Sequence, residues 1–321
     1  MPRSTNFLPE YASETGWRRI QALLPEHLRI NELSGQPTEE WLPLGAFSVH
    51  LDCWRRPKST ASLILVHGGG GNGRLLAPYG AMAAMAGYEV VAPDLPGYGL
   101  TQVKSRRELD YEDWRDTVAG VLEMQARRTE GPIIIFGLSM GGMLAYDATV
   151  RTRIPNGLIV TCLLDPRDAT VRRSLVRWAW MASLIGPMLS TVPALTDLLP
   201  VPMRVVGNMR GVANNLELSQ AIASDPRAGG TWMPGRFLRT FVNSAPLVEP
   251  EAFDICPVLL AHPADDRWTD ISITRAFFDR LSVAKRLVML ENAGHLPVEE
   301  PGATQLRAAM LDFLSQRSRR P

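Results

Sequence analysis

The feature that most constrains the fold of this chain is an apolar run that leads directly into a turn of small residues. Residues 133–137 read Ile-Ile-Ile-Phe-Gly, and Leu138, Ser139, Met140 and two glycines follow. β-Branched apolar residues favour a buried strand, and the apolar residues after the glycines favour a helix. Glycines two residues before and after the serine allow the strand and helix backbones to approach closely. The sequence therefore predicts that Ser139 lies at a helix N-terminus with its hydroxyl exposed, a position suited to a nucleophile.

The rest of the chain alternates between short apolar runs and stretches with a helical pattern. Continuous apolar strands separated by helices are typical of a parallel sheet that is covered on both faces. The predicted fold class is therefore α/β, with a mostly parallel, doubly wound sheet and an edge strand at residues 47–54. The apolar runs predicted as strands lie at residues 61–66, 88–92, 132–136, 157–164, 257–261 and 286–290, and a closing helix is predicted at residues 304–316.

This alternation is interrupted in the second half of the chain. Residues 166–254 carry several tryptophans, methionines and prolines between short helical stretches and do not follow a strand–helix–strand pattern. An inserted helical cap over the ends of the strands is the predicted structure. The predicted organisation is thus an N-terminal arm at residues 1–40, a core formed by residues 41–165 and 255–321, and a helical cap at residues 166–254.

The predicted cap supplies the candidate substrate-binding residues. Trp178, Met181 and Trp232 are predicted to contact an apolar part of the substrate, because methionine and tryptophan line adaptable apolar pockets. The alternative is that these side chains form the cap's own small core. Residues 178–196 carry no charged side chain, and this run is near the length of a membrane span. Interruption by glycine and proline favours a pair of short helices instead, so no stable membrane span is expected.

Composition and charge place the chain among ordinary globular proteins. Of 321 residues, 45% are hydrophobic and 21% charged, and 34 basic against 33 acidic residues give a formal net charge of +1. Because no excess of positive charge is present, nucleic acid is not an expected partner. Cys53, Cys162 and Cys256 are far apart in apolar settings, which indicates reduced core residues of a cytoplasmic protein rather than disulfides or a metal site. No secretion signal is visible in residues 1–30, and neither a metal nor a cofactor is predicted.

Two later motifs supply the partners that a serine nucleophile needs. Asp265 and Asp266 follow the predicted strand at residues 257–261, and His295 follows the last predicted strand. A serine hydroxyl becomes a good nucleophile when a neutral imidazole takes its proton and a carboxylate stabilises that imidazole. The chain order Ser, Asp, His, each after the carboxyl end of a strand, favours a catalytic set of Ser139, Asp266 and His295. Asp265 is the alternative acid, and ordinary turn and cap roles are the alternative for both aspartates.

A glycine-rich loop follows the predicted strand at residues 61–66. His67 is followed by four glycines, and a backbone without side chains can approach a bound carbonyl closely. The N–H groups of Gly69 and Met140 are therefore predicted to form an oxyanion hole.

The same loop permits a different interpretation. Gly68, Gly70 and Gly73 fit the pattern G-x-G-x-x-G, and Asp94 ends the next strand where a ribose-binding acid would belong. A dinucleotide-binding oxidoreductase is therefore an alternative, although a run so rich in glycine matches many spacings. A flexible loop without a chemical role is a second alternative.

Together these segments resemble the α/β-hydrolase superfamily over nearly all of residues 47–313. The segments that carry the resemblance are residues 137–142 for the nucleophile elbow, 67–69 for the oxyanion loop, 94–99 for the loop after the fourth strand, and 294–295 for the catalytic-histidine loop. Asp266 stands where relatives carry the acid of the triad. The resemblance implies an α/β-hydrolase fold with a cap.

Within that superfamily the chain resembles capped serine hydrolases. Residues 224–226, Ser-Asp-Pro, resemble a cap-region signature of monoacylglycerol lipase-like and lysophospholipase-like esterases. The resemblance implies a hydrolase that cleaves a carboxylic ester with an apolar acyl or alcohol part through an acyl-enzyme, with a small-molecule ester as its partner. Hydrolysis of a carbon–carbon, amide or lactone bond, cofactor-free perhydrolysis, and a non-catalytic ligand receptor are the alternatives, and no oligomeric state is predicted.

Overall fold

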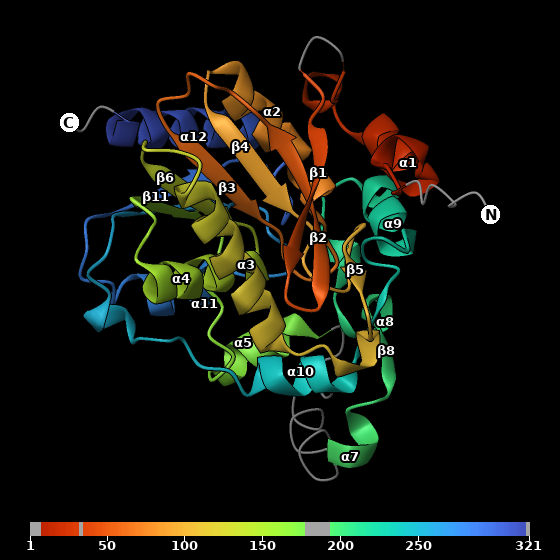
Figure 1. Cartoon of the computed structure of the whole chain (residues 1–321). Helices are drawn as coiled ribbons and strands as arrows, with labels where there is room; N and C mark the ends of the chain where they lie inside the picture. Colours follow the sequence, from red (N-terminus) through yellow and green to blue (C-terminus); the bar gives the residue numbers. More distant parts are fainter. Residues whose placement is uncertain (1–7, 32–34, 177–192, 319–321) are drawn as a thin grey trace.

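The computed structural model describes residues 8–31, 35–176 and 193–318, and a large sheet lies at its centre (Figure 1). In sheet order its strands are β1 (Thr38–Leu44), β2 (Phe47–Trp54), β4 (Glu89–Pro93), β3 (Ser62–Val66), β6 (Ile133–Gly137), β7 (Gly157–Val160), β10 (Val258–Pro263) and β11 (Lys285–Leu290), and β5 (Gln102–Val103) pairs with β2. β2 is antiparallel to β1, β4 and β5, and the strands from β4 to β11 are parallel. The predicted α/β class with a mostly parallel sheet is confirmed.

Helices cover both faces of this sheet, and Figure 1 shows α3 and α4 on the opposite side from α2 and α12. The covering helices are α2 (Ala77–Met85), α3 (Tyr111–Ala126), α4 (Met140–Thr152), α11 (Ile271–Phe278) and α12 (Gly302–Ser318). In β3, Leu63 and Leu65 belong to the buried cluster shared with α2 and α12. Ile64 and Val66 belong to the cluster shared with α3, α4 and α11. Since side chains alternate between the two faces of a strand, burial on both faces requires the continuous apolar run that the sequence shows.

The segment predicted as a cap, residues 166–254, packs over the carboxyl end of β6, because its side chains and Ser139 line one pocket. Its described elements are α5 (Ala169–Leu175), α7 (Pro193–Thr196), β8 (Pro200–Pro202), α8 (Met203–Val206), α9 (Leu216–Ser224), β9 (Trp232–Pro234) and α10 (Gly235–Val242). β8 and β9 form a small antiparallel sheet that the prediction of an all-helical segment did not include. Trp178 and Met181 lie outside the described residues.

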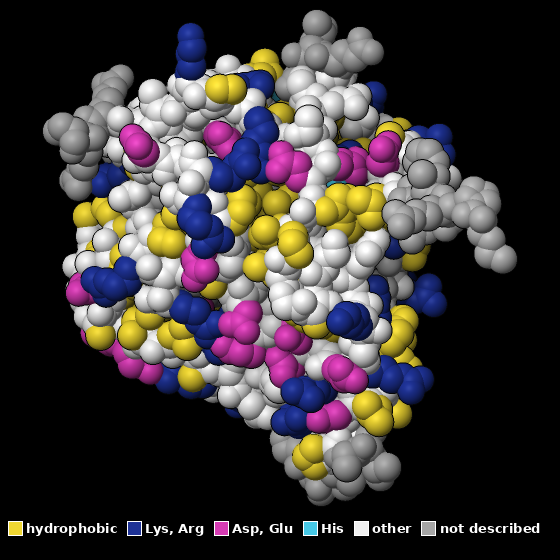
Figure 2. Space-filling model, viewed as in Figure 1, with side chains coloured by type: hydrophobic (Ala, Val, Ile, Leu, Met, Phe, Trp, Pro, Cys, Tyr) yellow, Lys and Arg dark blue, Asp and Glu magenta, His cyan; other side chains and the backbone are white. Residues whose placement is uncertain are grey.

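The uncharged stretch at residues 178–196 also falls mostly outside the described residues. In the part of the chain that the structure describes, no helix combines the length and the apolar character needed to cross a membrane. On the face shown in Figure 2, basic and acidic side chains are interspersed, as expected from their nearly equal numbers in the sequence.

The N-terminal arm packs into the body of the protein. It contains a short helical turn at Tyr11–Ser13 and helix α1 (Thr15–Leu23), and Figure 1 shows α1 beside α9. Tyr11, Trp17 and Ile20 are buried in the same apolar cluster as α2 and α12. The arm therefore connects the sheet core with the segment at residues 166–254, a role that its sequence did not indicate.

Candidate active site

Ser139 occupies the turn between β6 and α4 with φ of 56° and ψ of −129°, outside the conformations that an L-residue prefers. The flanking glycines make this turn possible. A Cβ on Gly137 would lie 2.2 Å from the carbonyl oxygen of Gly141, and a Cβ on Gly141 would lie 2.3 Å from that of Val66. The close backbone approach predicted at this turn is thus confirmed. The prediction of an exposed hydroxyl is wrong, because Ser139 is only 8% exposed: the surrounding loops shelter it in a site at the start of α4.

His295 and Asp266 lie close together in the loops that follow β11 and β10. Nδ1 of His295 is 2.8 Å from Oδ2 of Asp266, and both side chains are almost completely buried. Oδ1 of Asp266 accepts the backbone N–H groups of Trp268 and Thr269, and Oδ2 also accepts the Thr269 hydroxyl at 2.7 Å. Burial alone would raise the pKa of the Asp266 carboxyl, but His295 and these donors lower it to about 2. Asp266 is therefore a fixed anion, whereas the neighbouring Asp265 is exposed.

Ser139 and His295 line one small cavity with about 360 Å³ of empty space, counting the part open to solvent. Nε2 of His295 is buried and has no hydrogen-bond partner in the described structure. Since Nδ1 faces Asp266, Nε2 is the ring nitrogen left to exchange a proton with a group in the cavity.

The glycine-rich loop after β3 forms another wall of the same cavity. A Cβ on Gly68 would lie 2.9 Å from Cβ of Ser139 and 3.0 Å from the backbone nitrogen of Met140, so only glycine fits there. Gly69 lines the cavity beside Ser139. Met140 is the first residue of α4, and an N–H in the first turn of a helix has no acceptor within the helix. Gly69, Ser139 and Met140 also line one pocket together.

His67 holds the shape of this loop. Its Nδ1 donates to the carbonyl oxygen of Gly68 at 2.8 Å, and its Nε2 accepts the backbone N–H of Leu95 at 2.9 Å. A ring that donates at one nitrogen and accepts at the other is neutral, in agreement with burial lowering the pKa of His67. His67 is consequently a structural residue and is not available as a base.

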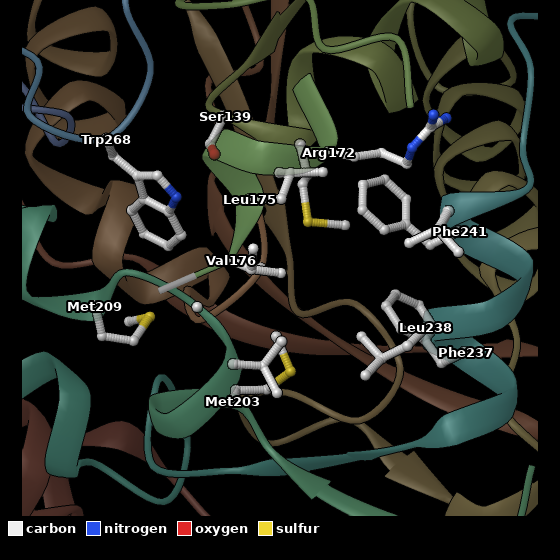
Figure 3. A pocket seen from close by; sticks show the side chains of 15 residues that line it. Ser139, Arg172, Leu175, Val176, Met203, Met209, Phe237, Leu238, Phe241 and Trp268 are labelled. Atoms are coloured by element: carbon white, nitrogen blue, oxygen red, sulfur yellow. The ribbon is translucent and has the colours of Figure 1, made fainter. Parts of the chain in front are cut away.

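A larger and mostly apolar pocket, with about 830 Å³ of empty space including its open part, begins at Ser139. Figure 3 shows Trp268 on one side and the side chains of α10 on the other. The described residues labelled there are Ser139, Arg172, Leu175, Val176, Met203, Met209, Phe237, Leu238, Phe241 and Trp268.

Of the three residues predicted to contact the substrate, only Trp232 lies in the described part of the chain. Trp232 is in β9, where the Arg106 guanidinium lies 5.5 Å from its ring centre, and it is not among the lining residues. Phe237 and Phe241 were not predicted, although their spacing of four places them on one face of α10. A search for apolar helix faces in residues 166–254 could have found them. For Trp268, the only sign in the sequence that it lies near the site is its position two residues after Asp266.

Asp94, the residue that a dinucleotide site would need, is completely buried. Its carboxylate accepts the N–H groups of Gly73 at 2.7 Å and Leu100 at 2.8 Å and the Tyr11 hydroxyl at 2.9 Å, and Nδ1 of His50 lies 3.0 Å away. A carboxylate surrounded in this way cannot reach a ribose. The glycine-rich loop therefore does not serve the dinucleotide site considered as an alternative.

A second group of acidic and histidine side chains could suggest a metal site. Glu39, His50 and Asp52 have potential ligand atoms within 4.8 Å of one another. However, Arg74 donates to both carboxylate oxygens of Asp52, at 2.5 and 2.7 Å, and to Glu39 at 2.9 Å. The guanidinium already supplies the positive charge that a metal ion would bring.

The doubly wound sheet, with a serine at a strand–helix turn and a histidine and an aspartate after later strands, defines the alpha/beta hydrolases as a class. The sequence profile of the alpha/beta hydrolase family matches residues 63–305, and the chain belongs to this family. The match to this family confirms the prediction that the protein is a hydrolase.

Individual relatives are more distant. Protein phosphatase methylesterase 1 of Mus musculus is 31% identical over 114 residues, which are 35% of this chain and 29% of that protein. The match thus spans less than a third of that relative. Phospholipase YtpA of Bacillus subtilis is 24% identical over 235 residues, which are 70% of this chain and 83% of the relative.

Solved structures confirm the fold. A soluble variant of monoglyceride lipase from Saccharomyces cerevisiae superimposes with a TM-score of 0.71 at 15% identity, over 88% of this chain and 96% of the lipase. The monoacylglycerol lipase of Paleococcus ferrophilus gives 0.66 at 18% identity, over 84% and 99%.

Proposed function

We propose that this protein hydrolyses carboxylic esters through an acyl-enzyme on Ser139. In this proposal His295 acts as the general base and then as the general acid, and the Asp266 carboxylate orients the His295 ring. The observation that carries the proposal is the shared cavity. It brings together Ser139 at its positive-φ turn and the unpartnered Nε2 of His295, whose other nitrogen is 2.8 Å from Asp266. The relatives named as methylesterase and phospholipase support an ester as the substrate.

The first half of the reaction forms the acyl-enzyme. Ser139 Oγ attacks the ester carbonyl while Nε2 of His295 accepts the hydroxyl proton. The Asp266 carboxylate stabilises the resulting imidazolium through Nδ1. The N–H groups of Gly69 and Met140 stabilise the oxyanion, and each such donor contributes about 3 kcal/mol to the stability of the transition state.

The second half returns the enzyme to its starting state. His295 gives its proton from Nε2 to the leaving alkoxide, and the alcohol departs. A water molecule then attacks the acyl-enzyme while His295 again accepts a proton. His295 returns this proton to Ser139 Oγ as the bond to the acyl group breaks and the acid is released.

The apolar pocket supports a substrate with an apolar acyl or alcohol part. Its walls are formed mainly by methionine, leucine, valine and phenylalanine side chains, and such walls bind hydrocarbon by removing it from water. We expect rates on p-nitrophenyl esters to rise from acetyl to medium chain length. A flat series, or one that is fastest on acetyl, would contradict the assignment of this pocket to the substrate.

A cytoplasmic location remains our expectation. It is supported by the three cysteines, which are all buried and form no disulfide.

The test is covalent labelling with a fluorophosphonate probe, which reacts with activated serines. The native protein should be labelled, and Ser139→Ala and His295→Ala should not. Ser315→Ala and His27→Ala serve as matched controls, because neither residue lines the cavity or the larger pocket, and both should leave labelling unchanged. Labelling of folded Ser139→Ala at the native rate would place the nucleophile elsewhere.

A further inference from the structure

Two buried ring nitrogens in the described structure stand out at the cavities beside Ser139 because neither has a hydrogen-bond partner. One is Nε2 of His295, which the proposed reaction explains, and the other is Nε1 of Trp268. A buried N–H without an acceptor costs about 1–3 kcal/mol. Such groups are uncommon in folded proteins and are often explained by a missing ligand or a catalytic role.

The Trp268 ring occupies a defined place between the two cavities. Its ring centre is 4.8 Å from that of His295, with an angle of 38° between the planes. It lines both the small cavity and the large pocket. In Figure 3 the indole nitrogen lies on the edge of the ring that faces Ser139.

The surrounding contacts hold this ring in position. The backbone N–H of Trp268 donates to Oδ1 of Asp266 at 2.7 Å. The ring also packs against the buried apolar cluster that includes Met209, Val212 and Leu296. The indole nitrogen is thus buried and has no partner in the described structure.

We propose that the indole N–H of Trp268 donates a hydrogen bond to an oxygen atom in the alcohol part of the substrate. This inference rests on the proposed function and specifies its substrate class. His295 must pass its proton to the leaving oxygen, so a ring packed against His295 lies beside the alcohol part. The facing wall is formed by Phe237, Leu238 and Phe241, whose side chains offer no polar group. Esters whose alcohol carries a second, acceptor oxygen are thus favoured over plain alkyl esters.

The experiment compares two hexanoate esters that differ by one oxygen, the 2-methoxyethyl ester and the n-butyl ester. Both alcohol parts have four heavy atoms, and the ether oxygen replaces one CH₂. The value of kcat/KM for the 2-methoxyethyl ester is divided by that for the n-butyl ester, in the native protein and in Trp268→Phe. This variant keeps an aromatic ring but removes the N–H. Dividing the two ratios cancels the different chemical reactivity of the esters. We expect the ratio of the native protein to be about five- to tenfold higher than that of Trp268→Phe, which corresponds to the loss of one net hydrogen bond.

Two further variants make the result specific to the N–H. Trp232→Phe changes a tryptophan that does not line the pocket and should leave the ratio unchanged. Incorporation of β-(3-benzothienyl)alanine at position 268 replaces N–H by sulfur in a ring of the same shape, so it tests the proposal even if Trp268→Phe fails to fold.

The possible results separate this inference from the proposed function. Equal losses on both esters, with a ratio within twofold of the native one, would reduce Trp268 to a packing residue and overturn the inference while ester hydrolysis stands. If the folded native protein hydrolysed neither ester and was not labelled at Ser139, the proposed function and the inference would both be overturned.

Discussion

The described part of the chain contains two buried histidine–carboxylate clusters that use the same groups differently. In one, His295 meets Asp266 at 2.8 Å beside the cavity. In the other, at the antiparallel edge of the sheet, His50 lies 3.0 Å from Asp94 and 2.9 Å from Glu39. The distances alone do not distinguish a reactive pair from a structural one.

The clusters differ in what surrounds the ring nitrogens. In the described structure, Nε2 of His295 has no partner and borders a cavity with Ser139. Each ring nitrogen of His50 lies within 3.0 Å of a carboxylate oxygen, although the contact of Nδ1 with Asp94 is an ion pair and lacks hydrogen-bond geometry, and His50 is completely buried. A histidine held between carboxylates stabilises the fold, whereas a histidine with a free nitrogen beside a nucleophile can exchange a proton with a substrate.

The second cluster also explains the packing of the N-terminal arm. The Tyr11 hydroxyl donates to Asp94, and its ring lies 4.5 Å from the Arg74 guanidinium. Arg74 directly follows Gly73, whose N–H donates to Asp94 at the end of the glycine-rich loop. The N-terminal arm thus helps to fix the glycine-rich loop, although the arm itself lies outside the candidate active site.

Among substitutions that test the difference between the two clusters, we expect the largest effect from Ser139→Ala, and we expect it on ester turnover. Ser139→Ala should lower ester turnover by about 10⁶-fold, as loss of a serine nucleophile does. The free energy of unfolding should change by less than about 1 kcal/mol, because removal of a hydroxyl at a cavity surface leaves no packing defect. Ester assays and denaturant unfolding measure the two quantities. Activity above a few percent of native would show that Ser139 is not the nucleophile.

Asp266→Asn should lower kcat by about 10⁴-fold, because the amide no longer stabilises the correct tautomer and the charged form of His295. Asp265→Asn is the matched control one residue away, with an exposed side chain, and should behave like the native protein. The kcat values of the two variants decide between these carboxylates. Comparable losses in both would contradict the assignment of Asp266.

Arg74→Met should act on stability rather than on turnover. It leaves the buried Asp52 without its cation, and removal of one partner from a buried ion pair costs about 3–5 kcal/mol. Arg151→Met, which removes a partly exposed cation from surface pairs, should cost at most about 1 kcal/mol. Urea unfolding gives both values. A loss of kcat as large as that of Asp266→Asn, with stability intact, would place the second cluster in the reaction itself.

The last prediction is a fall in thermal stability at alkaline pH. Burial alone would lower the pKa of His50, but Asp94, Glu39 and Asp52 raise it from 6.5 to about 10. The folded state thus holds the proton more tightly than the unfolded chain. The resulting stabilisation is complete below pH 6.5 and is lost as the pH rises toward 10.

The measurement for this last prediction is Tm across that pH range. His50→Gln should have a lower Tm at pH 6.5 and a smaller decrease as the pH rises. The same slope in the native protein and His50→Gln would mean that another group causes the alkaline loss.

Much of the fold and the candidate site could be predicted because the signals are local. The apolar runs and the glycines around Ser139 determine a strand, a turn and a helix through neighbouring residues alone. The placement of Asp266 and His295 after strands required only one further rule, that the carboxyl ends of parallel strands meet at one edge. The walls of the pocket did not follow from such rules, since they depend on how α10 and residues 203–209 pack over that edge.

The sequence by itself therefore determined the strand–helix alternation, the strained serine turn, and the order of the serine, aspartate and histidine, because short-range sterics and side-chain period decide them. Only the tertiary structure decided which histidine presents an unpartnered ring nitrogen to the cavity with Ser139. His50, His67 and His262 are as buried as His295, yet each has its contacts in other parts of the fold. Burial and partners are set by residues far apart in the chain, as when Tyr11 meets Asp94, and no local pattern contains that information.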